Sequence, residues 1–181
     1  PVLIGEPGEG KTASVGSLAA SCAEAGNRVL VIDADLRKPD THRIFDVPQG
    51  AGISDFLVNP ELTALAALVR PTNVPNVSII TAGTQLDYPA SLASRMGVVR
   101  EESGWLADIV LIDSAPLLAA SDVFDILPLA DTVMIVARSG RLTEDAGRRV
   151  AELLGRFRIP VAGVLLIGSR SGGRRGFAPG Y

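Results

Sequence analysis

A stretch near the start of the chain has the residue types that bind phosphate groups. Residues 5–12, GEPGEGKT, fit the pattern G-x-x-x-x-G-K-S/T and lie between an apolar run and a helical pattern of small residues. Glycines let backbone N–H groups close around phosphates, and the following helix points its positive end at them. Lys11 is expected to bridge the β- and γ-phosphates of a nucleoside triphosphate, and the Thr12 hydroxyl to ligate Mg²⁺. The residues expected to bind the nucleotide are Pro7, Gly8, Glu9, Gly10, Lys11, Thr12 and Ala13.

Two carboxylates follow the next apolar run. Residues 29–32, VLVI, lead into Asp33, and Asp35 comes two positions later. Strand periodicity directs both side chains to the same side, beside the phosphate loop. An isolated Asp-x-Asp more often forms a turn at a strand end. With a phosphate loop one strand away, we expect these carboxylates to serve Mg²⁺ or an incoming hydroxyl group.

A third acidic position completes the pattern. Residues 109–112, IVLI, precede Asp113, which fits the Walker-B pattern, in which the carboxylate binds Mg²⁺ or orders its water shell. Taken alone this signal is weak, because apolar strands often end in Asp. In order with the phosphate loop and the Asp-x-Asp pair it becomes strong, and it predicts a Mg·ATP site.

The elements that must position these groups alternate between strands and helices. Apolar runs predict strands over residues 2–4, 28–33, 77–81, 109–113, 132–137 and 161–167. Helical patterns fall over 13–25, 61–70, 89–103, 121–128 and 143–157. This alternation predicts an α/β fold with a doubly wound, mostly parallel sheet flanked by helices. Such folds bind ligands at the carboxyl ends of their strands, where the three aspartates lie.

Composition indicates a single globular domain. The chain has 181 residues, of which 47% are hydrophobic and 20% charged, and its net charge of −3 does not favour a nucleic-acid partner. A single cysteine excludes an internal disulfide. We expect one domain over 1–168 and a flexible tail rich in Gly and Arg over 169–181, ending in Tyr181. Because the chain opens inside the first strand, we expect it to be truncated at its N-terminus.

These motifs together resemble the cytoplasmic kinase domain of the bacterial tyrosine kinases that govern capsule and exopolysaccharide synthesis. That family belongs to the same P-loop superclass as the partitioning and septum-positioning ATPases. Residues 31–39, VIDADLRKP, resemble its Walker A′ motif and are the most discriminating match. Residues 52–57 and 130–136 are similar to further segments of the family. By resemblance, Asp33 is the catalytic base, and Asp35 and Asp113 belong to the Mg²⁺ shell.

The resemblance implies a protein-tyrosine autokinase. It implies transfer of the γ-phosphate of Mg·ATP to a C-terminal tyrosine of a neighbouring subunit, here Tyr181. It further implies a homo-oligomer, a membrane-embedded polysaccharide co-polymerase as activator, and a position in the cytoplasm at the inner face of the bacterial cell membrane.

Several features leave alternatives open. Partitioning-type relatives carry a signature lysine early in the loop, which is absent from residues 5–7, GEP; a non-kinase ATPase switch that docks on a membrane partner remains the alternative. A third interpretation is a pseudoenzyme with bound nucleotide. The family's kinases end in a tyrosine cluster, whereas this sequence ends in one tyrosine, so either the cluster lies beyond it or the chain has a single acceptor. Ile167 stands where asparagine is common, which leaves adenine recognition open. Arg138 and Arg141 follow a core strand and could contact phosphate, contact an adjoining subunit or be solvated.

Overall fold

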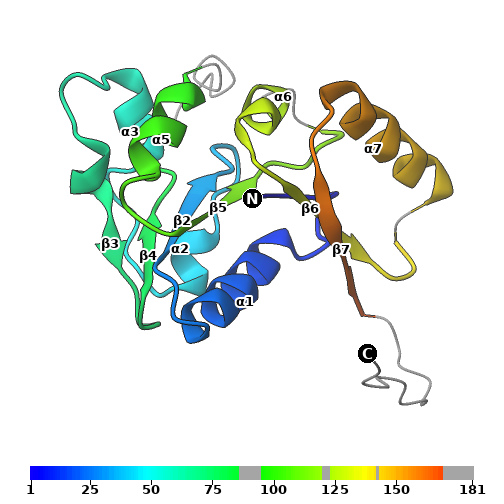
Figure 1. Cartoon of the computed structure of the whole chain (residues 1–181), viewed down its shortest axis with the longest axis horizontal. Coiled ribbons are helices and arrows are strands. Elements are labelled where there is room, and N and C mark those ends of the chain that lie inside the picture. The colour runs from blue at the N-terminus through cyan, green and yellow to red at the C-terminus, as the bar shows by residue number, and fades with distance from the viewer. Residues whose placement is uncertain (86–94, 120–122, 142, 169–181) are drawn as a thin grey trace.

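Seven strands form one sheet in a computed structural model that describes residues 1–85, 95–119, 123–141 and 143–168. The order across the sheet is β3-β4-β2-β5-β1-β6-β7 (Figure 1). The strands are β1 Val2–Ile4, β2 Val29–Ala34, β3 Arg70–Pro71, β4 Val77–Ile80, β5 Ile109–Ser114, β6 Val133–Arg138 and β7 Val161–Ile167. Neighbouring strands are parallel except for β3 and β4, which are antiparallel. The predicted mostly parallel sheet is confirmed.

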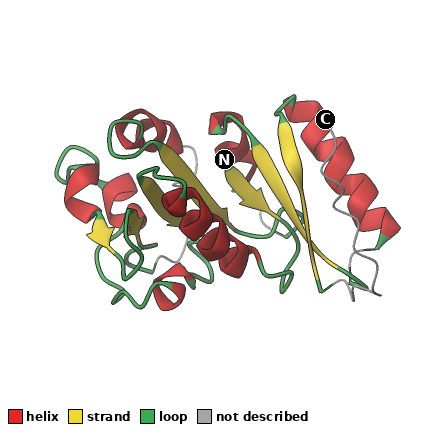
Figure 2. Ribbon diagram, turned by 60° about the horizontal axis from the view of Figure 1, so that its bottom comes forward, coloured by secondary structure: helices red, strands yellow, loops and turns green. Residues whose placement is uncertain are grey.

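Helices cover both faces of this sheet, as Figures 1 and 2 show. On one face lie α1 Lys11–Glu24 and α2 Thr41–Ile44. On the other lie α3 Ile53–Val58, α5 Met96–Ser103, α6 Val123–Ile126 and α7 Glu144–Phe157, with the 3₁₀ turns η1 Leu65–Leu68 and η2 Leu127–Leu129. The doubly wound arrangement is therefore confirmed.

The core divides into two layers because successive side chains of a strand point to opposite faces. On β2, Val29 and Val31 pack in the layer that contains α1, whereas Leu30 and Ile32 pack in the layer that contains α3, α5 and α7. All four side chains are buried. Because side chains on both faces of such a strand are buried, nearly all of its positions are apolar, which explains the continuous apolar runs of the sequence.

The inner strand β1 leads directly into the phosphate loop. It pairs in parallel with β5 on one side and with β6 on the other. The chain leaves β1 for α1 and returns through β2, which lies beyond β5. The carboxyl ends of β1, β2, β5 and β6 therefore meet at one edge of the sheet, where doubly wound folds bind their ligands.

The helix predicted over 61–70 is wrong. The Leu- and Ala-rich pattern forms only the short turn η1, and Arg70 begins β3. Because Pro71 follows, the α conformation is sterically disfavoured at Arg70. Arg70 pairs instead with Ile79 of β4, so that the backbone at this edge of the sheet gains a hydrogen-bonding partner.

Other predictions are met within the described residues. The helices predicted over 13–25 and 143–157 correspond to α1 and α7. Those predicted over 89–103 and 121–128 include α5, α6 and η2, while residues 89–94 and 121–122 lie outside the described part. The tail over 169–181 also lies outside it, so the division at residue 168 stays a prediction. Among the described helices, none has the length and apolar character needed to cross a membrane.

Gly52 is required where α3 meets the end of β4. A Cβ added at Gly52 would lie 2.1 Å from the carbonyl oxygen of Thr81 and 2.5 Å from the amide nitrogen of Gly83, and both atoms belong to the backbone. We expect Gly52→Ala to lower the free energy of unfolding by about 2 kcal/mol or more, because the backbone must shift to relieve this overlap. Urea denaturation followed by circular dichroism measures the change.

Gly97 provides the matched control. It lies within α5, and a Cβ added there would meet nothing within 4 Å. Gly97→Ala is expected to raise stability by up to about 1 kcal/mol, because alanine is the better helix former. Equal stability of Gly52→Ala and the wild type would contradict the proposed close approach.

Candidate active site

The phosphate loop spans the six residues between β1 and α1, and its backbone conformation depends on glycine. Gly8 has φ 75° and Gly10 has φ 90°, the left-handed region that residues with a Cβ rarely adopt. A Cβ added at Gly5 would lie 2.4 Å from the carbonyl oxygen of Val136, so β6 presses directly against the start of the loop. The loop leads directly into the N-terminus of α1, the end of a helix that attracts anions.

Two acidic side chains brace this loop from within. The backbone N–H of Glu6 donates to Oε2 of Glu9 at 2.7 Å, and Glu9 is only 2% exposed. The backbone N–H of Leu118 donates to Oε1 of Glu6 at 3.3 Å, which ties the loop to the segment after β5. Both glutamates occupy variable positions of the motif, so the pattern alone offered no signal of this bracing.

Lys11 is buried and surrounded by carboxylates. Its Nζ donates to the backbone carbonyl of Glu6 at 3.3 Å. Burial lowers the pKa of Lys11, and the nearby charges of Asp113, Asp35, Glu9 and Glu6 oppose that shift. The ammonium group therefore lies over the loop with one weak protein acceptor, which a phosphate oxygen could replace.

Asp113 carries an unpaired buried oxygen. It lies on β5 opposite Leu3 of β1 and Asp33 of β2, and it is 1% exposed. Burial raises its pKa to about 7; a hydrogen bond from the Thr12 side chain lowers it, and the charge of Asp33 raises it. Its Oδ1 has no hydrogen-bond partner. A buried carboxylate oxygen without a partner, beside a threonine hydroxyl, suits an oxygen-seeking divalent cation.

Asp33 is fully buried and hydrogen-bonded through both oxygens. Its Oδ1 accepts from the amide of Asp35 at 3.2 Å, and its Oδ2 accepts from the amide of Thr41 at 3.2 Å and from the Thr41 hydroxyl. Burial raises its pKa to about 6, while the bonds from Thr41 and Asp35 lower it. Thr41 lies eight residues from Asp33 and belongs to none of the sequence motifs, so no pattern predicted this contact.

Asp35 lies just beyond β2, which ends at Ala34. The expectation that its side chain points the same way as that of Asp33 therefore concerns a residue outside the strand and stays a prediction. Asp35 is half-buried, and its Oδ1 accepts from the amides of Arg37 and Lys38 at 3.3 and 3.0 Å, which shapes the turn that follows. Its charge nevertheless acts on Lys11 and Asp113, so it lies within the same electrostatic site.

Thr41 offers a direct test of the environment of Asp33. We expect Thr41→Ala to raise the pKa of Asp33, because the lost hydroxyl bond favoured the ionised carboxylate. If Asp33 acts as a base, the acidic limb of the pH–rate profile for nucleotide turnover moves to higher pH. Thr41→Ser keeps a hydroxyl and should restore the profile. Thr72→Ala, which changes a hydroxyl bonded only to Val74 and Val77, is the control; an unshifted profile in Thr41→Ala would contradict this assignment.

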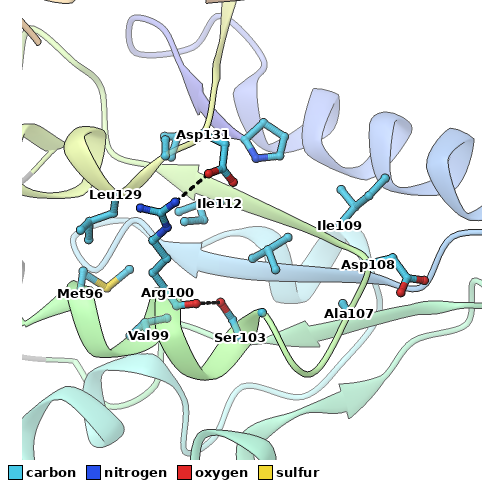
Figure 3. A pocket seen from close by; sticks show the side chains of 15 residues that line it. Met96, Val99, Arg100, Ser103, Ala107, Asp108, Ile109, Ile112, Leu129 and Asp131 are labelled. Atoms are coloured by element: carbon cyan, nitrogen blue, oxygen red, sulfur yellow. Dashed lines mark hydrogen bonds and ion pairs between the residues drawn. The ribbon is translucent and has the colours of Figure 1, made fainter. Parts of the chain in front are cut away.

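The molecule also has a cavity away from the phosphate loop. A cavity of about 300 Å³ opens at the opposite edge of the sheet, where Pro1, Asp108 and Asp131 mark the amino ends of strands (Figure 3). There Arg100 forms an ion pair with Asp131 at 2.8 Å. None of the three predicted aspartates lines this cavity, so it is separate from the candidate site.

The structure thus brings most of the predicted site residues to one edge. The phosphate loop, Lys11, Thr12, Asp33, Asp35 and Asp113 lie around the carboxyl ends of β1, β2 and β5. Ala13 is exposed on the first turn of α1. Tyr181, the predicted phosphate acceptor, lies outside the described residues. Within the described part of the chain, no group of three or more His, Cys, Asp or Glu side chains is arranged to hold a metal ion.

Comparisons with known proteins agree with this architecture. A family model described as an AAA domain matches residues 5–155. Tyrosine-protein kinase YwqD of Bacillus subtilis is 30% identical over 166 residues, which cover 91% of this chain and 69% of that protein. The longer tyrosine-protein kinase etk of Escherichia coli is 30% identical over 164 residues, and there the match spans only 22% of the relative's length.

Comparison with solved structures agrees with these sequence matches. The kinase domain of Escherichia coli tyrosine kinase ETK superimposes with a TM-score of 0.86 at 28% identity, covering 99% of this chain and 72% of that one. The septum site-determining protein MinD of Pyrococcus horikoshii, complexed with Mg-ADP, has a TM-score of 0.79 at 19% identity over 93% of this chain and 71% of its own, and shares the fold. The chain belongs to the AAA-domain family matched over residues 5–155 and, within it, to the bacterial tyrosine-protein kinases.

Proposed function

We propose that this chain transfers the γ-phosphate of Mg·ATP to a tyrosine hydroxyl. The observation that carries the proposal is the convergence of Lys11, Thr12 and the unpaired Oδ1 of Asp113 at the carboxyl ends of β1 and β5. Phosphoryl transfer depends mainly on positioning and on charge neutralisation, which amides, a lysine and a divalent cation provide. The named relatives of this chain are tyrosine-protein kinases, and their activity supports the same assignment.

The residues that would hold Mg²⁺ are Thr12 and Asp113, with Asp35 in the water shell. Mg²⁺ keeps several waters and uses one or two protein ligands together with phosphate oxygens. When bound, the ion neutralises charge on the transferring phosphate. Asp113, with a pKa of about 7, must lose its proton to act as a ligand.

Asp33 is the proposed base for the tyrosine hydroxyl. A pKa of about 6 suits a group that accepts a proton near neutral pH. Because Asp33 is fully buried, the residues that cover it must move before the carboxylate can reach an incoming hydroxyl. The base would therefore be exposed only when the segment after β2 moves to admit an acceptor.

The acceptor tyrosine, the activator and the location of the domain are proposed as well. We propose Tyr181 as the acceptor, phosphorylated in trans within a homo-oligomer. A membrane-embedded polysaccharide co-polymerase is the proposed activator, which places the domain at the inner face of the bacterial cell membrane. These assignments rest on the named relatives and on the motif over residues 31–39, and they concern assemblies larger than this chain.

A mixing experiment tests transfer in trans. Chains with an intact site but with Tyr181→Phe serve as donors, and chains carrying Lys11→Met serve as acceptors, with γ-³²P-labelled ATP and Mg²⁺. Label on Tyr181 of the acceptor is expected. Tyr88→Phe in the acceptor is the control, because it removes the one other tyrosine. Released phosphate without labelled tyrosine would instead support a non-kinase ATPase switch that docks on a membrane partner.

A further inference from the structure

Two arginines, one at the end of β6 and one in the turn that follows, lie against the phosphate loop. Arg138 is the last residue of β6, and Arg141 follows three positions later. A Cβ added at Gly10 would lie 3.7 Å from Nη2 of Arg138, and one added at Gly8 would lie 3.0 Å from Nη1 of Arg141. Each guanidinium group therefore faces one of the two left-handed glycines of the loop.

Among the described residues, no ion pair neutralises these two guanidinium groups. The Nε of Arg138 is buried and has no hydrogen-bond partner. Over residues 1–85, 95–119, 123–141 and 143–168, the ion pairs involve other arginines. A buried cationic donor without a partner is costly to maintain. An anion from outside the chain could supply the missing partner.

The backbone holds the two arginines in place. The amide of Ser139 donates to the carbonyl of Ile167 at 2.8 Å, which fixes the loop to β7. The amide of Arg141 donates to the carbonyl of Arg138 at 3.1 Å, and Gly140 has φ 78°. The loop is thus a tight turn, and both side chains project from a fixed backbone.

The charge balance of the site also requires additional cations. Lys11 is the cation of the phosphate loop, and four carboxylates act on it: Asp113, Asp35, Glu9 and Glu6. A nucleoside triphosphate adds further negative charge to this region. A single lysine cannot offset it, and a bound divalent cation compensates only part.

We propose that Arg138 and Arg141 bind the nucleotide's phosphates. They would approach the phosphates from the β6 side of the phosphate loop, opposite the side on which β2 lies. Arginine suits this position because its planar group donates two parallel hydrogen bonds to phosphate oxygens. The inference rests on the proposed function only in taking a nucleoside triphosphate as the ligand. It assigns to the loop after β6 a binding role that the phosphate-loop motif does not contain.

Displacement of a fluorescent ATP analogue from the 181-residue chain tests the proposal. The competitors are ATP and inorganic tripolyphosphate, which lacks both base and ribose. We expect Arg138→Gln and Arg141→Gln each to lower the affinity for both competitors by the same factor, about tenfold or more. The reason is that each variant loses a charge-assisted hydrogen bond. Arg148→Gln is the matched control, since Arg148 lies on α7 and pairs with Glu144 at 3.0 Å.

The outcome of this experiment distinguishes a contact with the phosphates from a contact with the base or the ribose. Unchanged affinity for both competitors in both variants would overturn the phosphate contact. A lower affinity for ATP with an unchanged affinity for tripolyphosphate would also overturn it, and would indicate that the arginines recognise the base or the ribose. Arg138→Lys keeps the charge and should recover only part of the affinity. Melting temperatures identify any variant that fails to fold, and Arg141→Gln, in an exposed loop, tests the proposal independently of the β6 backbone. If the wild-type chain bound no ATP, the proposed function itself would fail.

Discussion

Lys11→Met is expected to lower the rate of phosphate transfer from Mg·ATP by about 1,000-fold, the scale of losing a preorganised charge at a reacting centre. Methionine keeps the apolar stem of a side chain that is only 8% exposed, so the packing around α1 should persist. The variant leaves the loop's amides intact but removes the positive charge among four carboxylates. Nucleotide affinity should fall as well. Steady-state phosphate release and direct nucleotide binding measure the two effects separately.

The control for this prediction is Arg148→Met, which removes an exposed cation on α7 far along the chain from the site. It should turn over ATP at the wild-type rate. Wild-type turnover in Lys11→Met, with its melting temperature unchanged, would contradict the placement of the active site at the phosphate loop.

Asp113→Asn is expected to stabilise the protein while removing its activity. The pKa of Asp113 is about 7 in the folded protein, against an ordinary value of 3.8. At pH 8 the folded chain must hold a buried carboxylate, and the neutral amide avoids that cost. The difference in pKa corresponds to a gain in the free energy of unfolding on the order of 4 kcal/mol. Turnover should fall about 100-fold or more, because a ligand for Mg²⁺ is lost.

The same shift determines how the stability of the wild-type protein depends on pH. Between about pH 4 and pH 7 the unfolded chain has already released the proton of Asp113, while the folded chain retains it. The free energy of unfolding therefore falls as pH rises through this window and levels off above it. Asp33, with a pKa of about 6, contributes in the same direction. Urea titrations from pH 4 to pH 8 in EDTA should show a weaker slope in Asp113→Asn.

Asp108→Asn is the matched control for this experiment. Asp108 directly precedes β5, at the other end of the strand from Asp113, and its hydrogen bonds from Arg28 lower its pKa. That variant should lose a little stability at neutral pH and keep its turnover. An Asp113→Asn chain that is less stable than the wild type at pH 8, without Mg²⁺, would contradict the burial of an uncompensated carboxylate.

The sequence predicted the fold well where burial dictates composition. β2 and β5 are covered on both faces, so their apolar runs and the aspartates after them stood out. It predicted less where elements are short. The helices α2 and α3 have four and six residues, too few to display a helical period. The helix prediction failed around Arg70 because pairing at the edge of the sheet and the following Pro71 outweighed a favourable helical composition.

For the site, the motifs identified Lys11, Thr12 and Asp113 but not their surroundings. The bond from Thr41 to Asp33 depends on the path of the chain after β2, which no local pattern encodes. The unpaired Nε of Arg138 likewise becomes visible only when β6 and the phosphate loop are placed side by side. Residue types predict which chemistry is available, whereas hydrogen-bond partners depend on three-dimensional packing.

The most direct test of the central claim is one reaction in which phosphotyrosine formed and phosphate released are both quantified. The chain is incubated with Mg²⁺, γ-³²P-labelled ATP and a co-polymerase cytoplasmic segment as activator, and labelled positions are mapped by mass spectrometry. We predict label on Tyr181 that disappears in Lys11→Met. Phosphate released without any labelled tyrosine, or ATP retained without turnover, would contradict a tyrosine kinase.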